Sequence, residues 1–183
     1  MHFIDQILGT DSVLILGGGS GNLLKKLLKR YPQLTVDYID ISAKMIQLAR
    51  EKTQNPSIVN FIVGTEQNIP NRNYTVVITN FYLDLFAEQT LERVIQKIKT
   101  HLNPEARWLV TDFVSEKGWH KIMLWIMYRF FRIVAGIEAR KLPNWQQYLI
   151  AVHGRKIMSK KFYAGFVMAS VFEFKTGYVQ ERG

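Results

Sequence analysis

The glycine-rich stretch Gly17-Gly-Gly-Ser-Gly21 directly follows an apolar run, Val13 to Leu16. Glycine has no Cβ, so the chain can adopt positive φ there and let a ligand lie against bare backbone. The helix-forming segment that follows would point its first N–H groups at that ligand. The glycines do not fit the dinucleotide pattern G-x-G-x-x-G, because its third glycine would fall on Asn22. The loop residues expected to contact a ligand are Gly17, Gly18, Gly19 and Gly21.

Asp40 supplies a second anchor for such a ligand. It ends a β-forming segment, residues 34–40, and comes 23 residues after Gly17. A carboxylate at the tip of the second strand can accept both hydroxyl hydrogens of a ribose, as it does in nucleoside-binding α/β folds. The loop and Asp40 together favour a nucleoside ligand. The alternative is any βα turn that cradles a phosphate or nucleotide.

Five segments, in this order and spacing, resemble the motifs of class I S-adenosylmethionine (SAM)-dependent methyltransferases. They are Leu14–Gly21, Tyr38–Met45, Val59–Glu66, Tyr74–Asn80 and Leu102–Asp112, and they cover about the first two thirds of the chain. The resemblance implies an α/β three-layer sandwich around a seven-stranded, mostly parallel sheet of order 3-2-1-4-5-7-6. The last two strands would form an antiparallel hairpin. It also implies a methyltransferase that uses SAM and releases S-adenosylhomocysteine.

The resemblance assigns the cofactor contacts residue by residue. Beyond the glycine loop they are Asp40 on the ribose, Ile41 and Met45 beside the adenine, Thr65 and Glu66 near its edge, and Thr79 and Asn80 after the fourth strand. Met45 fits a plain helix core equally well, and Thr79-Asn80 also fits a strand-end turn. Ile15 stands where the family usually has an acid that helps to hold the methionine end of the cofactor.

Methyl transfer from a sulfonium needs alignment and exclusion of water more than it needs acid–base groups. A general base matters only where the nucleophile must lose a proton. The candidates for that role are Tyr82, Asp84 and His120, although Asp84 also fits a helix-capping acid. The prolines of the Asn/Asp-Pro-Pro-aromatic box, typical of enzymes that methylate exocyclic amino groups of bases, are missing after Asn80, which disfavours that chemistry.

The charge of the chain is unevenly placed. Residues 1–117 carry 13 basic and 12 acidic side chains, whereas residues 118–183 carry 11 and 3, within a net charge of +9. Thirteen of the 23 aromatic side chains also lie after residue 117. Such folds place their substrate site in this basic, aromatic third. The uneven distribution of charge and aromatic side chains therefore indicates the chemistry of the substrate or partner. With no cysteine and four scattered histidines, the sequence predicts no disulfide and no metal.

The segment 119–134 favours a helix without acids, in which basic and polar aromatic side chains share one sector. It is too short and too charged to span a bilayer. Three interpretations stay open: a helix buried against the sheet beneath a lid, a homodimer contact, or contact with an anionic membrane surface. We expect residues 118–153 to form a substrate-side helical lid. The expected substrate contacts are Tyr128, Arg129, Arg132 and Trp145.

The elements that must position these residues alternate without a linker, which predicts one α/β domain over residues 1–183. Strands are expected near 12–17, 35–40, 58–64, 75–80 and 107–113. Helices are expected near 21–31, 43–54, 88–101, 117–135 and 144–153. Asn103-Pro104 predicts a turn into the fifth strand. Ala164-Gly165 predicts the tip of a closing hairpin between residues 156–163 and 166–174.

These observations predict a cytoplasmic methyltransferase, in peripheral contact with membrane if the basic helix meets anionic lipid. Its acceptor would be a hydrophobic small molecule or a lipid- or quinone-like compound. One alternative is a methyltransferase for RNA or another polyanion, which uses the basic third. Another is a non-catalytic SAM- or nucleoside-binding protein, suggested by Ile15.

Overall fold

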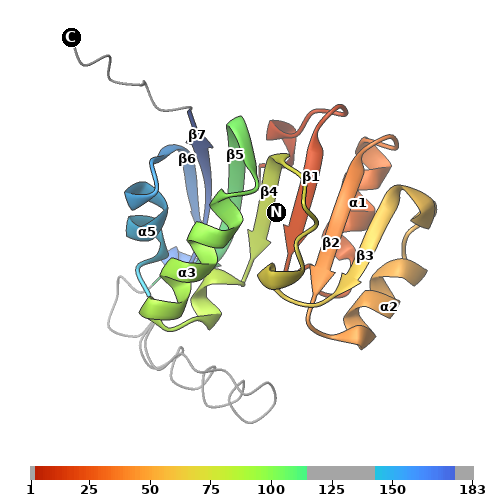
Figure 1. The fold of residues 1–183 in the computed structure, drawn as a ribbon, viewed down its shortest axis with the longest axis horizontal. Coiled ribbons are helices and arrows are strands. Elements are labelled where there is room, and N and C mark those ends of the chain that lie inside the picture. Colours follow the sequence, from red (N-terminus) through yellow and green to blue (C-terminus); the bar gives the residue numbers. More distant parts are fainter. Residues whose placement is uncertain (1–2, 115–142, 176–183) are drawn as a thin grey trace.

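The computed structural model describes residues 3–114 and 143–175, in which seven strands form one sheet (Figure 1). The strand order is β3-β2-β1-β4-β5-β7-β6, with β1 to β5 parallel and β7 antiparallel to both of its neighbours. This order confirms the predicted topology. The strands are β1 (Ser12–Leu16), β2 (Thr35–Asp40), β3 (Val59–Val63), β4 (Tyr74–Asn80), β5 (Leu102–Phe113), β6 (Gly154–Phe162) and β7 (Val167–Phe174).

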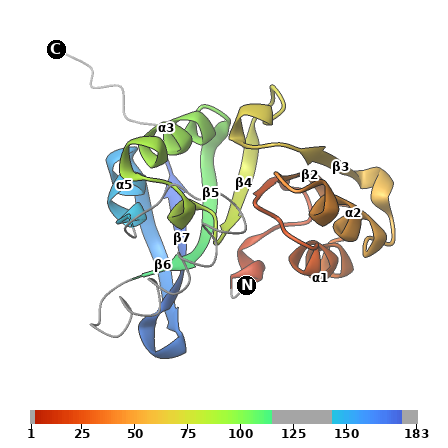
Figure 2. The ribbon, with the colours of Figure 1, turned by 90° about the horizontal axis from the view of Figure 1, so that it is seen from below.

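Helices cover both faces of the sheet, so the fold has the three predicted layers. The α-helices of the described residues are α1 (Asn22–Arg30), α2 (Ala43–Glu51), α3 (Glu88–Lys99) and α5 (Trp145–Ala151). Figure 2 shows α3 and α5 on one side of the sheet and α1 and α2 on the other. The core is divided in the same way, with one buried cluster under α3 and α5 and a second under α1 and α2.

The sequence of β1 explains how one strand serves both layers. Successive strand side chains point to opposite faces. Leu14 and Leu16 therefore enter the cluster under α3, whereas Val13 and Ile15 enter the cluster under α1 and α2. All four side chains are buried, as expected for a parallel strand covered on both faces. Ile15 is thus a core residue and places no carboxylate beneath the loop that follows.

The fifth strand differs from its prediction at its beginning. It starts at Leu102 and includes Asn103 and Pro104, where a turn was predicted. The register with β4 jumps between the pairs Tyr74–Leu102 and Val76–Arg107, and Glu105 has a φ of 62°. Proline cannot donate to the ladder and is tolerated in strands at such irregularities. Pro104 therefore interrupts the pairing without ending the strand.

The end of the described chain agrees with its prediction. β6 and β7 form the expected hairpin around Tyr163–Gly165, and α5 lies within the predicted 144–153 segment. The helix predicted near 117–135 lies outside the described residues. Within residues 3–114 and 143–175, no helix has the length and apolarity needed to cross a membrane.

A buried carboxylate links the amino ends of three neighbouring strands, the side of the sheet called here its amino edge. Asp37, 1% exposed, accepts hydrogen bonds from the Tyr74 hydroxyl at 2.6 Å and from Asn60 Nδ2 at 2.7 Å. Arg72 forms an ion pair with the same carboxylate. Strands β2, β3 and β4 are thereby linked at their beginnings. With its lone pairs used by three donors, this charge is well compensated.

We expect Asp37→Ala to lower the free energy of unfolding by about 3 kcal/mol, because it strands buried hydrogen-bond donors and a cation. The measurement is urea unfolding of both proteins. Asp5→Ala is the control: its partner Arg30 is 2.8 Å away, both side chains are more than half exposed, and its loss should cost less than about 0.5 kcal/mol. Equal losses of unfolding free energy in the two variants would show that the buried Asp37 network stabilises the fold no more than an exposed ion pair does.

Candidate functional site

The glycine loop between β1 and α1 has the backbone conformation that its spacing predicted. Gly17, Gly19 and Gly21 have φ values of 64°, 66° and 81°. Residues with a Cβ rarely adopt these values, so the alternation of glycines follows from the turn itself. A Cβ on Gly19 would meet no heavy atom within 4 Å. The middle of the loop therefore faces open space in which a ligand could contact backbone.

Each remaining glycine is fixed by a neighbour. The ring of Tyr38 packs against Gly18, and the Tyr38 hydroxyl donates to the Gly19 carbonyl at 2.9 Å. Gly17 lies under Tyr82, whose ring carbon would be 2.8 Å from an added Cβ. Gly21 precedes α1 and packs on the Ala49 backbone of α2, where an added Cβ would come within 2.6 Å. The loop is thus held on three sides and open at Gly19.

Asp40 holds the loop against the end of β2. Its Oδ2 accepts the Gly19 N–H at 2.8 Å, and its Oδ1 accepts the Ser42 N–H at 2.9 Å. The side chain is 9% exposed. Each carboxylate oxygen can accept a further hydrogen bond. The arrangement therefore suits a carboxylate that both fixes the loop and receives ligand hydroxyls at its open edge.

Two apolar side chains lie beside Asp40. Ile41 is 75% exposed, and Met45 is half-buried in the first turn of α2, where its N–H donates to the Ser42 hydroxyl. A large aliphatic side chain as exposed as Ile41, next to a loop open to ligand, suits an apolar wall for a flat ring. The roles of Ile41 and Met45 at an adenine remain predictions.

The acid after β3 is Glu66, and its side chain turns inward. Thr65 caps the short 3-10 helix Glu66–Asn68, whereas Glu66 is buried and accepts the Tyr82 hydroxyl at 2.9 Å. Burial and the adjacent Glu66 carboxylate raise the pKa of Tyr82. Tyr82 therefore stays protonated and acts as a hydrogen-bond donor across the ends of β3 and β4. Its part in catalysis remains a prediction.

Asp84 belongs to a buried pair that the sequence did not reveal. Asp84, in the 3-10 helix Leu83–Leu85 after β4, is 1% exposed, and Asp112 near the end of β5 is fully buried. A hydrogen bond joins the two carboxyl groups, and Asp112 also accepts the Leu83 N–H at 2.9 Å. Burial raises the pKa of both carboxyls, and the adjacent Asp84 raises the pKa of Asp112 further. The pair therefore binds protons more tightly than exposed aspartates do.

Thr79 and Asn80 end β4 on opposite faces of the sheet. Thr79 is buried and accepts the Trp108 indole N–H at 3.0 Å, so its side chain belongs to the core under α3. The Asn80 side-chain oxygen is also buried, and within residues 3–114 and 143–175 it is one of a few side-chain atoms with no hydrogen-bond partner. An unsatisfied amide at the ligand edge of a sheet suggests a group that a ligand completes.

Of the residues predicted at the substrate, Trp145 is the one that the structure describes. It begins α5, is 1% exposed, and donates its indole N–H to the Phe113 carbonyl at 3.1 Å. Its ring therefore supports the end of β5 from the core. The remaining predicted residues, His120, Tyr128, Arg129 and Arg132, lie outside the described residues, as does most of the predicted lid 118–153.

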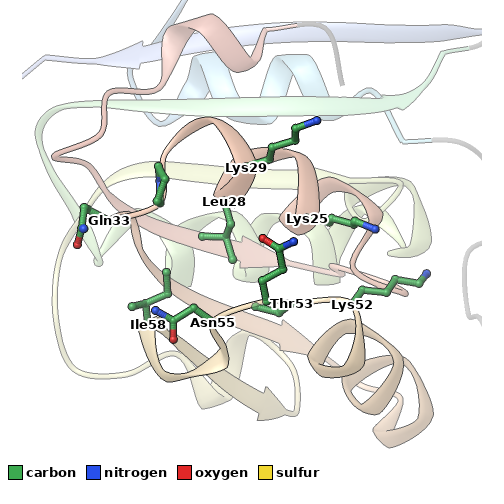
Figure 3. A pocket seen from close by; sticks show the side chains of 10 residues that line it. Lys25, Leu28, Lys29, Gln33, Lys52, Thr53, Asn55 and Ile58 are labelled. Atoms are coloured by element: carbon green, nitrogen blue, oxygen red, sulfur yellow. The ribbon is translucent and has the colours of Figure 1, made fainter.

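A hollow of about 470 Å³ lies away from this edge, between α1 and the segment that joins α2 to β3 (Figure 3). Leu28 and Ile58 line it together with Lys25 and Lys52. Lys52 Nζ donates to Ser20 Oγ at 3.2 Å and to Asn22 Oδ1 at 3.0 Å, and so it braces the glycine loop from outside. The hollow contains none of the residues predicted at the site.

Comparison with known proteins agrees with the geometry. The family model described as a methyltransferase domain matches residues 13–105. That match takes in the glycine loop, Asp40, Glu66 and β4.

The chain belongs to the class I SAM-dependent methyltransferase family.

Two individual relatives match parts of this chain. Malonyl-[acyl-carrier protein] O-methyltransferase 1 of Ilyobacter polytropus is 36% identical over 70 residues, which are 38% of this chain and 26% of that protein. Demethylmenaquinone methyltransferase of Thermotoga maritima is 24% identical over 106 residues, which are 57% of this chain and 44% of that protein. This chain thus spans less than half the length of either relative.

The structural match covers more of the chain than the sequence matches do. Human N-acetylserotonin methyltransferase, solved in complex with SAM, superposes with a TM-score of 0.70 at 17% identity. The match covers 94% of this chain and 50% of that one. At this identity the likeness establishes the shared fold and nothing about the acceptor.

We expect Gly21→Ala to lower the free energy of unfolding by about 2–4 kcal/mol, from backbone strain and from overlap with the Ala49 backbone. Gly19→Ala is the matched control: its φ is similar, nothing lies near its Cβ, and strain alone should cost about 1 kcal/mol. Chemical denaturation of the two variants gives both numbers. A loss at Gly19 as large as that at Gly21 would mean that steric contact with α2 is unimportant.

The acid pair predicts how stability depends on pH. Because the folded-state pKa of both carboxyls is raised, the folded protein binds protons more tightly than the unfolded chain. The stabilisation is complete below about pH 4, the ordinary pKa of aspartate, and is lost as pH rises toward the folded pKa. Asp112→Asn should flatten this decline, which for one proton is at most about 1.4 kcal/mol per pH unit.

Urea unfolding between pH 5 and pH 8 measures the decline, with the exposed Asp5→Asn as the control that should keep the parent's slope. Parallel curves for the parent and Asp112→Asn would show that the pair does not bind protons more tightly than the unfolded chain does.

Proposed function

We propose that this chain transfers a methyl group from SAM to a hydrophobic small-molecule or lipid- or quinone-like acceptor. One observation carries the proposal: the Gly19 N–H and the Asp40 carboxylate meet at 2.8 Å at the carboxyl edge of a sheet with the class I strand order. In α/β sheets, ligands bind outside the carboxyl ends of the strands, where the strand order reverses. The reversal here lies between β1 and β4, beside the loop.

The residues present fit SAM. Positive-φ glycines with open space beside Gly19 suit a ligand that lies against backbone, and Asp40 retains acceptor capacity for ribose hydroxyls. The remaining contacts that we propose are Ile41 and Met45 along the adenine, Thr65 and Glu66 at its edge, and Thr79 and Asn80 near the methionine end. Because Ile15 is buried in the core, the amino group of the cofactor must find its acceptor elsewhere.

SAM, when bound, supplies a methyl carbon on a sulfonium that is already a good leaving group. What remains for the protein is to align the acceptor with that carbon and to exclude water. Tyr82 suits this task as a fixed ring beneath Gly17, since its hydroxyl stays protonated and donates to Glu66. Asp84 is buried and hydrogen-bonded to Asp112, so an acceptor proton would reach it only after that pair opens. His120 is the third proposed acid–base group.

The relatives support an acceptor that is small or carried by a protein. Their names specify a malonyl group on acyl-carrier protein and a demethylmenaquinone. A hydrophobic acceptor, bound by Tyr128, Arg129, Arg132 and Trp145 and presented by a membrane surface, accords with the second of these names. Residues 3–114 and 143–175 hold no cluster of three or more metal-binding side chains.

A polyanion such as RNA is the second candidate acceptor, and edge strand β6 favours it. Arg155, Lys156, Lys160 and Lys161 are exposed along this strand. Lysines on an edge strand also prevent edge-to-edge aggregation, which gives them a use without a ligand. Incubation with labelled SAM and separate lipid, quinone and RNA extracts would discriminate among the acceptors. Binding of SAM without transfer to any extract would favour a non-catalytic module.

We expect calorimetry to detect binding of SAM and S-adenosylhomocysteine and none of NAD. Asp40→Ala should weaken binding of both by about 1–3 kcal/mol, because ribose hydroxyls lose charge-assisted partners and the loop loses its anchor. Asp37→Asn, at the opposite edge of β2, is the control and should leave the dissociation constant unchanged once folding is verified. Micromolar affinity for NAD without binding of SAM would overturn the proposal.

A further inference from the structure

Three phenylalanine rings form a row along the ligand edge of the sheet. Phe81 directly follows β4, Phe113 ends β5, and Phe166 precedes β7. Ring centroids lie 4.8 Å apart between Phe81 and Phe113 and 4.9 Å apart between Phe113 and Phe166, at interplanar angles of 43° and 44°. Phe166 is 6% exposed and Phe81 is 44% exposed. The row is therefore anchored in the core at one end and open at the end beside the glycine loop.

The open ring is held in a costly conformation. Phe81 has a φ of 50°, which costs a bulky residue roughly 1–3 kcal/mol. Its N–H donates to the Thr111 carbonyl at 2.8 Å, and Phe113 packs against its ring, so the position is fixed. Burial does not repay the strain, because nearly half of the side chain faces solvent. A strained and exposed aromatic at the ligand edge indicates a ring that is kept for contact with something else.

Two unpaired polar atoms lie at the foot of this row. Asn80 and Thr111 are register partners in β4 and β5, and their side chains point to the same face of the sheet. Among the described residues, Asn80 Oδ1 and Thr111 Oγ1 are buried and make no hydrogen bond. An amide oxygen only accepts, whereas a threonine hydroxyl both donates and accepts. Both atoms lie beneath the surface, so the exposed Phe81 ring is the part of this edge that a ligand can reach.

We propose that Phe81 and Phe113 form a stacking platform for a planar aromatic ring of the methyl acceptor. This assignment rests on the proposed function and narrows its acceptor to an aromatic compound. Offset or edge-to-face ring contact favours aromatic over aliphatic partners by about 0.5–1.5 kcal/mol per pair. A ring stacked on Phe81 would lie on the side of the glycine loop, since β4 pairs with β1.

The test measures binding of 1-naphthol and of its saturated counterpart, decahydro-1-naphthol, to the full chain with and without S-adenosylhomocysteine. We expect 1-naphthol to bind about three- to tenfold more tightly, a difference of the size that ring contact supplies. Phe81→Leu should abolish this preference and leave S-adenosylhomocysteine binding unchanged. Tyr163→Leu is the matched control: it also has a φ of 50° and is exposed, so it should retain the preference.

The inference is overturned if 1-naphthol does not bind, if both saturated and aromatic probes bind equally, or if Phe81→Leu keeps the preference. Loss of S-adenosylhomocysteine binding in the parent would instead overturn the proposed function, so the two failures are distinguishable.

Discussion

The hydrogen bond from the Gly19 N–H to Asp40 is the contact on which the site depends. It requires the chain after β1 to turn with positive φ, which only residues without a Cβ do readily. It also requires β1 and β2 to be neighbours, so that the end of β2 reaches the loop. The Tyr38 hydroxyl, two residues before Asp40 on the same strand, holds the Gly19 carbonyl. One strand thus fixes both polar groups of one glycine, and the loop stays open only where a ligand would lie.

Much of this arrangement could be predicted from the sequence, because it depends on local rules. Alternate glycines after an apolar strand demand a turn with alternating positive φ, and Asp40 follows at the spacing of a βαβ unit. The strand order was predicted from the resemblance of five motifs to those of class I methyltransferases, and the structure has this order. Pro104 misled the prediction at β5, because a proline alone does not reveal whether the chain turns or only skips its pairing.

The rest of the site could not be predicted, because it depends on contacts between residues distant in the chain. Asp84 was predicted as a candidate base that also fits a helix cap, and no sequence signal shows that Asp112, 28 positions later, lies against it. Phe81 could be placed after the fourth strand, but neither its positive φ nor its ring contact with Phe113 leaves a sequence signal. The substrate role of Trp145 stays a prediction, and no sequence signal shows that its indole N–H donates to the Phe113 carbonyl.

Within the described part of the chain, unpaired buried polar atoms occur at both edges of the sheet, since His101 Nε2 at the amino edge makes no hydrogen bond, but the buried acids of the amino edge are better satisfied. At the amino edge, Asp37 is surrounded by three donors, and Asp11 accepts from Thr75 and Arg107. At the carboxyl edge lie a strained Phe81, two buried carboxyls with raised pKa values, and the unpaired oxygens of Asn80 and Thr111. Native proteins leave few such groups buried without reason. The amino edge therefore serves stability, and the cost concentrated at the opposite edge is explained if that edge is built for a ligand that completes it.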